Sequence, residues 1–295
     1  MDLMHASRRD VSVPYRGAAH PTALWHYPAR GTAAARRPVL LIHGFRGDHH
    51  GLSFIADRLR TREAYIPDLP GFGATAPLPD GLRIDTYVDY LDGLTSMIEQ
   101  QTGLPPLVIG HSFGSILTAH WAARHHDTEA AAPLVLINPI VAPALEGTNR
   151  VMTRASQLYY WAGRRLPERA GQALLRNRLI VRLMSEVMAT TRDPGLRRLI
   201  HDQHARHFSD FTDRDSLAEA FEISIRHTVA EVADRLVMPV RVIAGDADAI
   251  APLAAAEAFV GDLPDGRLTV LPGVGHLTHY ERPEEIAALI DALDA

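Results

Sequence analysis

The chain has 295 residues, of which 46% are hydrophobic, and carries a formal net charge of −5 at pH 7. It is therefore long enough for one large core, or for a core with one inserted subdomain. All 30 basic residues are arginine and they are scattered along the chain, which together with the negative charge disfavours a nucleic-acid partner. Cysteine is absent, so disulfides and a cysteine nucleophile are excluded, and a reducing compartment is favoured.

No segment of the sequence indicates export or membrane insertion. Residues 1–10 contain neither the apolar stretch nor the small-residue cleavage site of a signal peptide. No run reaches the roughly 18 apolar residues that a spanning helix needs. We therefore expect a cytoplasmic protein without a membrane span. The sequence does not indicate an oligomeric state.

Short apolar runs rich in β-branched residues recur along the chain, and most lack polar alternation. This pattern is typical of strands buried on both faces of a parallel sheet. Strands are predicted at residues 39–42, 64–66, 107–109, 134–137, 240–243 and 268–271. Helical patterns lie between them, at residues 52–60, 84–101, 113–124, 253–260 and 284–293, and Pro252 and Pro283 open the last two. The alternation predicts an α/β fold with a mostly parallel sheet and helices on both faces. Segments around Ser12 and at 24–27 can add an antiparallel edge hairpin.

About 100 residues between Asn138 and Val240 show no strand pattern, which is far more than a plain connection needs. The interval contains three apolar stripes at helical spacing, and Ser216 with Glu219 predicts a capping box at the start of the third. We expect a helical cap at residues 139–235, over the carboxyl ends of the strands. The core then comprises residues 1–138 and 236–295. The stripes are Val151, Ala155, Leu158, Tyr159 and Ala162; Leu175, Leu179, Leu183 and Val187; and Leu217, Phe221, Ile225, Val229, Val232 and Leu236.

A pentapeptide, Gly110-His111-Ser112-Phe113-Gly114, lies between a predicted strand and a predicted helix. In this context G-x-S-x-G is typical of a nucleophile elbow, a turn so sharp that the serine is forced towards positive φ. A serine hydroxyl is a poor nucleophile at neutral pH, so it needs a base and an acid that orients the base. His276, after the last strand, is the candidate base, and Asp248, just past the strand at 240–243, is the candidate acid. Asp246 and His279 are the nearest rivals.

Further motifs support a family resemblance. With the elbow, and with the chain order Ser, Asp, His, they make the chain resemble the α/β-hydrolase family over residues 39–139 and 237–295. Some members place the acid at the position of Asn138, which cannot carry the charge. The motifs are Leu41-Ile42-His43-Gly44-Phe45, Asp68-Leu69-Pro70-Gly71-Phe72-Gly73 and Glu281-Arg282-Pro283-Glu284.

The resemblance implies a serine hydrolase that cleaves small to medium carboxylic esters, without metal or cofactor. Ser112 would form an acyl-enzyme, His276 would move the proton, and the backbone N–H groups of Phe45 and Phe113 would form the oxyanion hole. The same residues would also serve for a carbon–carbon bond in a vinylogous diketone, a thioester or a lactone. A further hypothesis is a function of another class, in which the protein senses a ligand and turns it over slowly.

For other residues that could take part in chemistry, a structural interpretation is favoured. His43 is expected to be structural. His201, His204 and His207 lie at i, i+3 spacing and offer three metal ligands, but a solvated histidine-rich face is favoured. The cluster Tyr159-Tyr160-Trp161 either lines a substrate pocket or packs the cap on the core, and packing is favoured.

Overall fold

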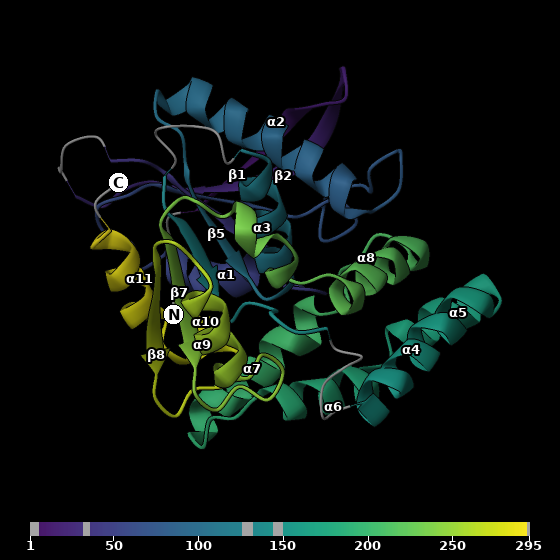
Figure 1. Cartoon of the computed structure of the whole chain (residues 1–295). Coiled ribbons are helices and arrows are strands. Elements are labelled where there is room, and N and C mark those ends of the chain that lie inside the picture. Colours follow the sequence, from purple (N-terminus) through teal and green to yellow (C-terminus); the bar gives the residue numbers. More distant parts are fainter. Residues whose placement is uncertain (1–5, 32–35, 126–131, 144–149, 294–295) are drawn as a thin grey trace.

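The computed structural model describes residues 6–31, 36–125, 132–143 and 150–293, excluding the side chains of residues 150–153. Within these residues eight strands form one sheet in the order β1-β2-β4-β3-β5-β6-β7-β8 (Figure 1). The strands are β1 (Ser7–Tyr15), β2 (Ala18–Tyr27), β3 (Val39–Ile42), β4 (Ala64–Pro67), β5 (Leu107–His111), β6 (Leu134–Ile137), β7 (Val240–Gly245) and β8 (Gly266–Leu271).

The strands from β3 to β8 run parallel, whereas β1 and β2 form an antiparallel hairpin whose second strand pairs with β4. The predicted α/β fold, with its edge hairpin, is therefore confirmed. Every residue of β3, β4 and β6 is buried, which explains why these runs show no polar alternation.

Helices cover both faces of the sheet. Leu40 and Ile42 point to the face covered by α2 and α3, while Leu41 between them points to the face covered by α1 and α11, as the period of two in a strand requires. The helix α9 packs beside α3 on the first face. These helices, with the short α10, are α1 (His49–Ala56), α2 (Ile84–Thr102), α3 (Phe113–Arg124), α9 (Leu253–Gly261), α10 (Thr278–Glu281) and α11 (Pro283–Asp291).

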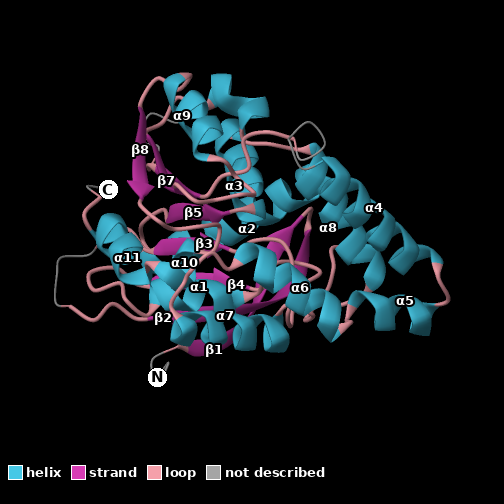
Figure 2. Cartoon of the chain, turned by 90° about the horizontal axis from the view of Figure 1, so that it is seen from below, coloured by secondary structure: helices cyan, strands magenta, loops and turns pink. Residues whose placement is uncertain are grey.

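A helical segment is inserted between β6 and β7, and Figures 1 and 2 show it gathered on one side of the molecule. We call α4 to α8 the cap helices; the exact division into core and cap stays an interpretation. No helix in the described ranges has the length and hydropathy to cross a membrane. The cap helices are α4 (Arg150–Arg165), α5 (Glu168–Leu175), α6 (Arg178–Met188), α7 (Pro194–His207) and α8 (Arg214–Arg226), followed by a 3-10 helix (Ala230–Arg235).

Two of the three apolar stripes face the protein interior only in part, although Leu175 of the second is buried. Leu158 of the first is 64% exposed, and Leu179 and Leu183 of the second are 81% and 65% exposed. The third stripe is buried along its length. Helical spacing shows which residues share a face, but it does not show whether that face meets protein or solvent. The side chain of Val151 lies outside the described residues.

The capping box predicted at Ser216 is wrong. The helix α8 begins one turn earlier, where the Asp213 carboxylate accepts hydrogen bonds from the backbone N–H groups of Asp215 and Ser216. An aspartate at this position supplies the acceptor that the first turn needs, so Ser216 lies inside the helix. The Glu219 carboxylate instead accepts from the backbone N–H of Leu82, at 2.8 Å.

Candidate active site

Ser112 occupies the sharp turn between β5 and α3. Its φ of +53° is strained for a residue with a Cβ, and it holds the hydroxyl clear of the sheet. The flanking positions must be glycine because a side chain would not fit. A Cβ on Gly114 would lie 2.2 Å from the carbonyl oxygen of Ile42, and a Cβ on Gly110 would lie 2.5 Å from the carbonyl oxygen of Gly114. The sequence thus folds locally into the elbow that its pattern predicted.

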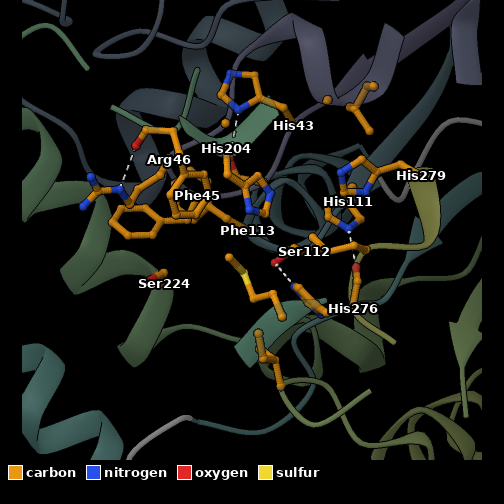
Figure 3. A pocket seen from close by; sticks show the side chains of 18 of the residues that line it. His43, Phe45, Arg46, His111, Ser112, Phe113, His204, Ser224, His276 and His279 are labelled. Atoms are coloured by element: carbon orange, nitrogen blue, oxygen red, sulfur yellow. Dashed lines mark hydrogen bonds between the residues drawn. The ribbon is translucent and has the colours of Figure 1, made fainter. Parts of the chain in front are cut away.

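The side chains of Ser112, His276 and Asp248 form one line of hydrogen bonds, although they lie in three separate loops. The Ser112 Oγ lies 2.8 Å from Nε2 of His276 (Figure 3), and Nδ1 of His276 lies 2.7 Å from the Asp248 carboxylate. All three residues are buried. The other Asp248 oxygen accepts from the backbone N–H groups of Ile250 and Ala251, at 2.7 and 2.9 Å, which fixes the carboxylate in place.

The Asp248 carboxylate is held in its charged form. Burial alone would raise its pKa, but the attraction and hydrogen bond of His276, with the two backbone donors, outweigh burial and lower the pKa. A charged acceptor at Nδ1 favours the imidazole tautomer with its proton on that nitrogen. Nε2 is then free to accept the hydroxyl proton of Ser112. The arrangement can therefore activate a serine oxygen for attack on a carbonyl.

Neither rival residue shares this geometry. Asp246 is exposed, and its carboxylate accepts from the backbone N–H of Gly273 at 2.6 Å. His279 is buried with its ring centroid 4.4 Å from that of His111, edge to face. In the described structure no hydrogen bond joins His279 to Ser112.

Asn138 has a role that sequence reasoning missed. Its side-chain amide donates to the carbonyl oxygens of Gly275 and His276, at 3.0 and 2.9 Å, and accepts from the backbone N–H of Gly245 at 3.0 Å. His111 donates from Nε2 to the same His276 carbonyl, at 3.1 Å. The end of β6 therefore holds the loops that carry the candidate base and the candidate acid. An amide suits this position because the side chain here must both donate and accept hydrogen bonds.

Phe45 and Phe113 line the wall of the same cavity as Ser112 (Figure 3). Phe113 is the first residue of α3, so its N–H has no acceptor within the helix. Phe45 follows Gly44 in a turn closed by the N–H of Gly47, which leaves the Phe45 N–H outside that hydrogen bond. The position of both amides is consistent with the predicted anion site, and their role stays a prediction.

His43 is structural, as expected. Its Nδ1 donates to the carbonyl of Gly44 at 2.9 Å, and its Nε2 accepts from the backbone N–H of Leu69 at 3.0 Å. Burial lowers its pKa, so the ring stays neutral. Both nitrogens are used to hold the Phe45 turn, and neither is left for chemistry.

Arg46 joins the Phe45 turn to the cap helices and has no carboxylate partner in the described structure. It is 2% exposed, and its guanidinium donates to the carbonyl oxygens of Leu175 at 2.8 Å and Phe208 at 3.0 Å. These carbonyls end α5 and α7, where the helix dipole favours a cation. The guanidinium also lies 5.3 Å from the ring centroid of Phe208, within cation–π range.

A cavity of about 270 Å³ opens from Ser112 between the core and the cap helices. Its wall is mainly apolar, with Phe45, Phe113 and Ile140 from the core side. None of the residues Tyr159, Tyr160 and Trp161 lines it, and Tyr160 instead packs behind Phe45, as favoured. The cap helices contribute Met188, Gln203, His204, His207, Phe208, Ser224 and Ile225.

The histidines of α7 do not form the solvated face that was favoured. His201 and His204 are buried and both bond Oγ of Ser185, at 2.6 and 2.8 Å. His207 instead stacks on His50, with ring centroids 3.6 Å apart. The three therefore do not converge on one ion.

A different trio, Asp48, His50 and His207, brings its ligand atoms within 4.8 Å of one another. A metal must lie near the plane of each imidazole that binds it. Two rings stacked with 20° between their planes cannot both meet that condition. This geometry disfavours a metal.

Comparison with known proteins agrees with the fold. A family model described as "Alpha/beta hydrolase family" matches residues 39–289. A pimeloyl-[acyl-carrier protein] methyl ester esterase of Chromobacterium violaceum is 27% identical over 87% of this chain and 94% of its own. Lipase LipV of Mycobacterium tuberculosis is 37% identical over 37% of this chain and 39% of its own. The solved structure of a thermophilic esterase from Thermogutta terrifontis superposes with a TM-score of 0.71, at 22% identity, over 96% of both chains. The chain thus belongs to the alpha/beta hydrolase family and has esterases and lipases among its relatives.

Proposed function

We propose that this hydrolase is a serine esterase that cleaves carboxylic esters with small to medium acyl groups. The observation that carries the proposal is the hydrogen-bonded line from Ser112 through His276 to Asp248, at 2.8 and 2.7 Å. The line begins at a strained elbow that has no evident structural use. Esterases and lipases among the relatives support the same reaction class.

In the proposed reaction, Ser112 Oγ attacks the ester carbonyl while His276 Nε2 takes the hydroxyl proton. The oxyanion that forms accepts hydrogen bonds from the backbone N–H groups of Phe45 and Phe113. His276 then gives the proton to the leaving alkoxide, which departs as the alcohol and leaves an acyl-enzyme. Water, deprotonated by the same histidine, attacks the acyl-enzyme and releases the acid. Asp248 stabilises the imidazolium in both steps.

The cavity favours an apolar acyl group of limited size. Its volume of about 270 Å³ lies just below the roughly 300–1,000 Å³ range of small-molecule pockets. Phe45, Ile140 and Phe208 offer apolar surface next to the serine. The thioester, lactone and carbon–carbon alternatives use the same three residues, and no described feature favours one of them.

A hydrolysis panel tests the proposal. It contains p-nitrophenyl esters of graded acyl length, a lactone, a thioester and a vinylogous diketone. The wild type is expected to turn over the shorter esters repeatedly, and Ser112→Ala to lose activity by up to about a millionfold. Ser224→Ala, a serine in the same cavity wall, is the matched control and should keep most of it.

Two outcomes would reject the proposal. One is ester turnover by Ser112→Ala above a few percent of the wild-type rate. The other is a single round of acylation of Ser112 without further turnover, which would favour a ligand sensor.

A further inference from the structure

Arginine occurs along the whole chain but is enriched in the segment from α4 to α7. Residues 150–207 contain twelve arginines and four acidic residues, a surplus of eight positive charges in a chain whose net charge is −5. Seven of them, whose side chains the structure describes, are exposed and have no acidic partner in the described residues: Arg154, Arg165, Arg169, Arg178, Arg192, Arg198 and Arg206. A surface of this kind attracts anions.

On α4, the exposed face combines arginine with large apolar side chains. Arg154, Leu158, Trp161 and Arg165 follow one another at spacings of four, three and four residues, so they share one side of the helix. All four are exposed, and Leu158 and Trp161 are 64% and 58% exposed. Two apolar side chains thus stand in water between two positive charges.

On α6, the same combination recurs. Leu179, Leu183 and Val187 follow one another at four-residue spacing and are 81%, 65% and 51% exposed. Arg178 and Arg182 flank this row on the side of the helix towards solvent, and Arg182 is paired with Glu186 at 2.6 Å. The opposite side of α6 is buried and packs on α7, so the exposed row is not the result of a displaced helix.

We propose that the outer faces of α4 and α6 dock the protein on an anionic lipid surface. A bilayer interface offers negative headgroups beside an apolar layer, so it satisfies the arginines and the exposed Leu, Val and Trp side chains together. An acidic protein would match the arginines but would leave Leu179 and Leu183 without an apolar partner. A second copy meeting this face with its own would bring positive charges together.

The position of the two helices suits such docking. Both belong to the group of cap helices on one side of the molecule (Figures 1 and 2). The helix α6 ends at Met188, which lines the cavity that contains Ser112. Docking through α6 would therefore bring the rim of the cavity close to the lipid. The inference does not depend on the proposed esterase activity, because it concerns binding.

Vesicle sedimentation tests the proposal. The full-length protein is mixed with phosphatidylcholine vesicles that contain or lack 30% phosphatidylglycerol. We expect binding to the anionic vesicles only. Leu179→Ser with Leu183→Ser should weaken it at least tenfold, and Arg154→Gln with Arg165→Gln about fivefold per arginine, since each contributes about 1 kcal/mol near an anionic surface. The fluorescence of Trp161 should shift to the blue on binding, and Trp161→Phe should remove that shift.

Matched controls separate this surface from general effects. Val237→Ser changes a 51% exposed valine, and Arg267→Gln an exposed arginine, and both residues lie outside the cap helices. Neither should change binding. Ser112→Ala should bind vesicles like the wild type, which separates docking from hydrolysis.

Failure to sediment with phosphatidylglycerol vesicles would overturn the proposal. So would binding that the arginine variants weaken but the leucine variants leave unchanged, because an acidic protein would then be the better partner. A concentration-dependent dimer that the leucine variants abolish, with no vesicle binding, would assign the face to a second copy instead.

Discussion

Ser112, His276 and Asp248 owe their alignment to neighbours that take no part in the proposed chemistry. Asn138 and His111 both donate to the backbone carbonyl of His276 and so fix the position of its ring. Burial lowers the pKa of His111 to about 3, so this ring is neutral near pH 7. It therefore adds no positive charge beside the imidazolium that His276 would form in the proposed reaction.

The role of Asp248 leads to a prediction. In Asp248→Asn the side chain no longer carries the charge that selects the His276 tautomer, so kcat should fall by about ten-thousandfold with the fold unchanged. Asp246→Asn is the control, because the Asp246 carboxylate accepts from the backbone N–H of Gly273 and not from His276 in the described structure. Equal losses in the two variants, measured on the best ester of the panel, would contradict the assignment of the acid.

The three residues proposed for catalysis could be predicted because each is fixed by its own local signal. Ser112 lies in an elbow pattern, and Asp248 and His276 each follow a recognisable strand. Asn138 could not be found in that way, because its partners, Gly245 and the Gly275-His276 loop, are more than 100 residues distant along the chain. The sequence excluded it as an acid but did not show that it holds the loop of the base.

At the scale of elements, the strands were predictable and the faces of the cap helices were not. The strands from β3 to β6 are buried on both sides, so their composition alone identifies them. The faces of α4 and α6 depend on what each helix meets in space. A stripe such as Leu179 and Leu183 has the same spacing whether it packs on the protein or faces outward.

Gly93 in α2 offers a test of packing between elements. A Cβ at this position would lie 1.8 Å from the carbonyl oxygen of Pro14 in β1, so α2 and the edge hairpin touch through their backbones. Alanine normally stabilises a helix interior by up to about 1 kcal/mol relative to glycine. Here the clash should reverse the sign, and Gly93→Ala should lower the free energy of unfolding by about 1–3 kcal/mol.

Gly261 in α9 is the matched control, because nothing lies within 4 Å of the place its Cβ would take. Gly261→Ala should raise the free energy of unfolding by about 0.4–1 kcal/mol. Urea unfolding of both variants measures the two signs. If Gly93→Ala were as stable as the wild type, the close contact between α2 and β1 would be refuted.

For the whole molecule, the charges around Asp48 link the core to the cap helices. The Asp48 carboxylate bonds His50 of α1 at 3.0 Å, and His207 of α7 stacks on His50. Burial by itself would lower the pKa of His50, but the hydrogen bond and charge of Asp48 outweigh burial and raise that pKa. Burial, and to a smaller extent the charge of His50, lower the pKa of His207. The two stacked rings therefore share a single positive charge, which one of them carries.

This arrangement predicts how stability depends on pH. The pKa of His50 is raised above its ordinary value of 6.5. The charged His50 therefore contributes its full stability to the fold below pH 6.5, and this stability is lost as the pH rises through the raised pKa. His50→Gln should therefore lower Tm more at pH 6 than at pH 9, by on the order of 2 °C. In an Asp48→Asn background that difference should shrink, since Asp48 is the main group that raises the pKa of His50. A Tm difference that is equal at both pH values would contradict the pairing.

Arg46 has a consequence for how the molecule moves. Its guanidinium is held by the last carbonyls of α5 and α7, and its backbone belongs to the turn that presents the Phe45 amide. If these helices moved away from the sheet, the guanidinium would either lose both carbonyl acceptors or pull the Phe45 turn with it. A state open enough to exchange bulky molecules by that route would therefore lack the proposed anion site at the Phe45 amide. Under the proposed mechanism, the protein could not be open through α5 and α7 and competent for hydrolysis at the same time.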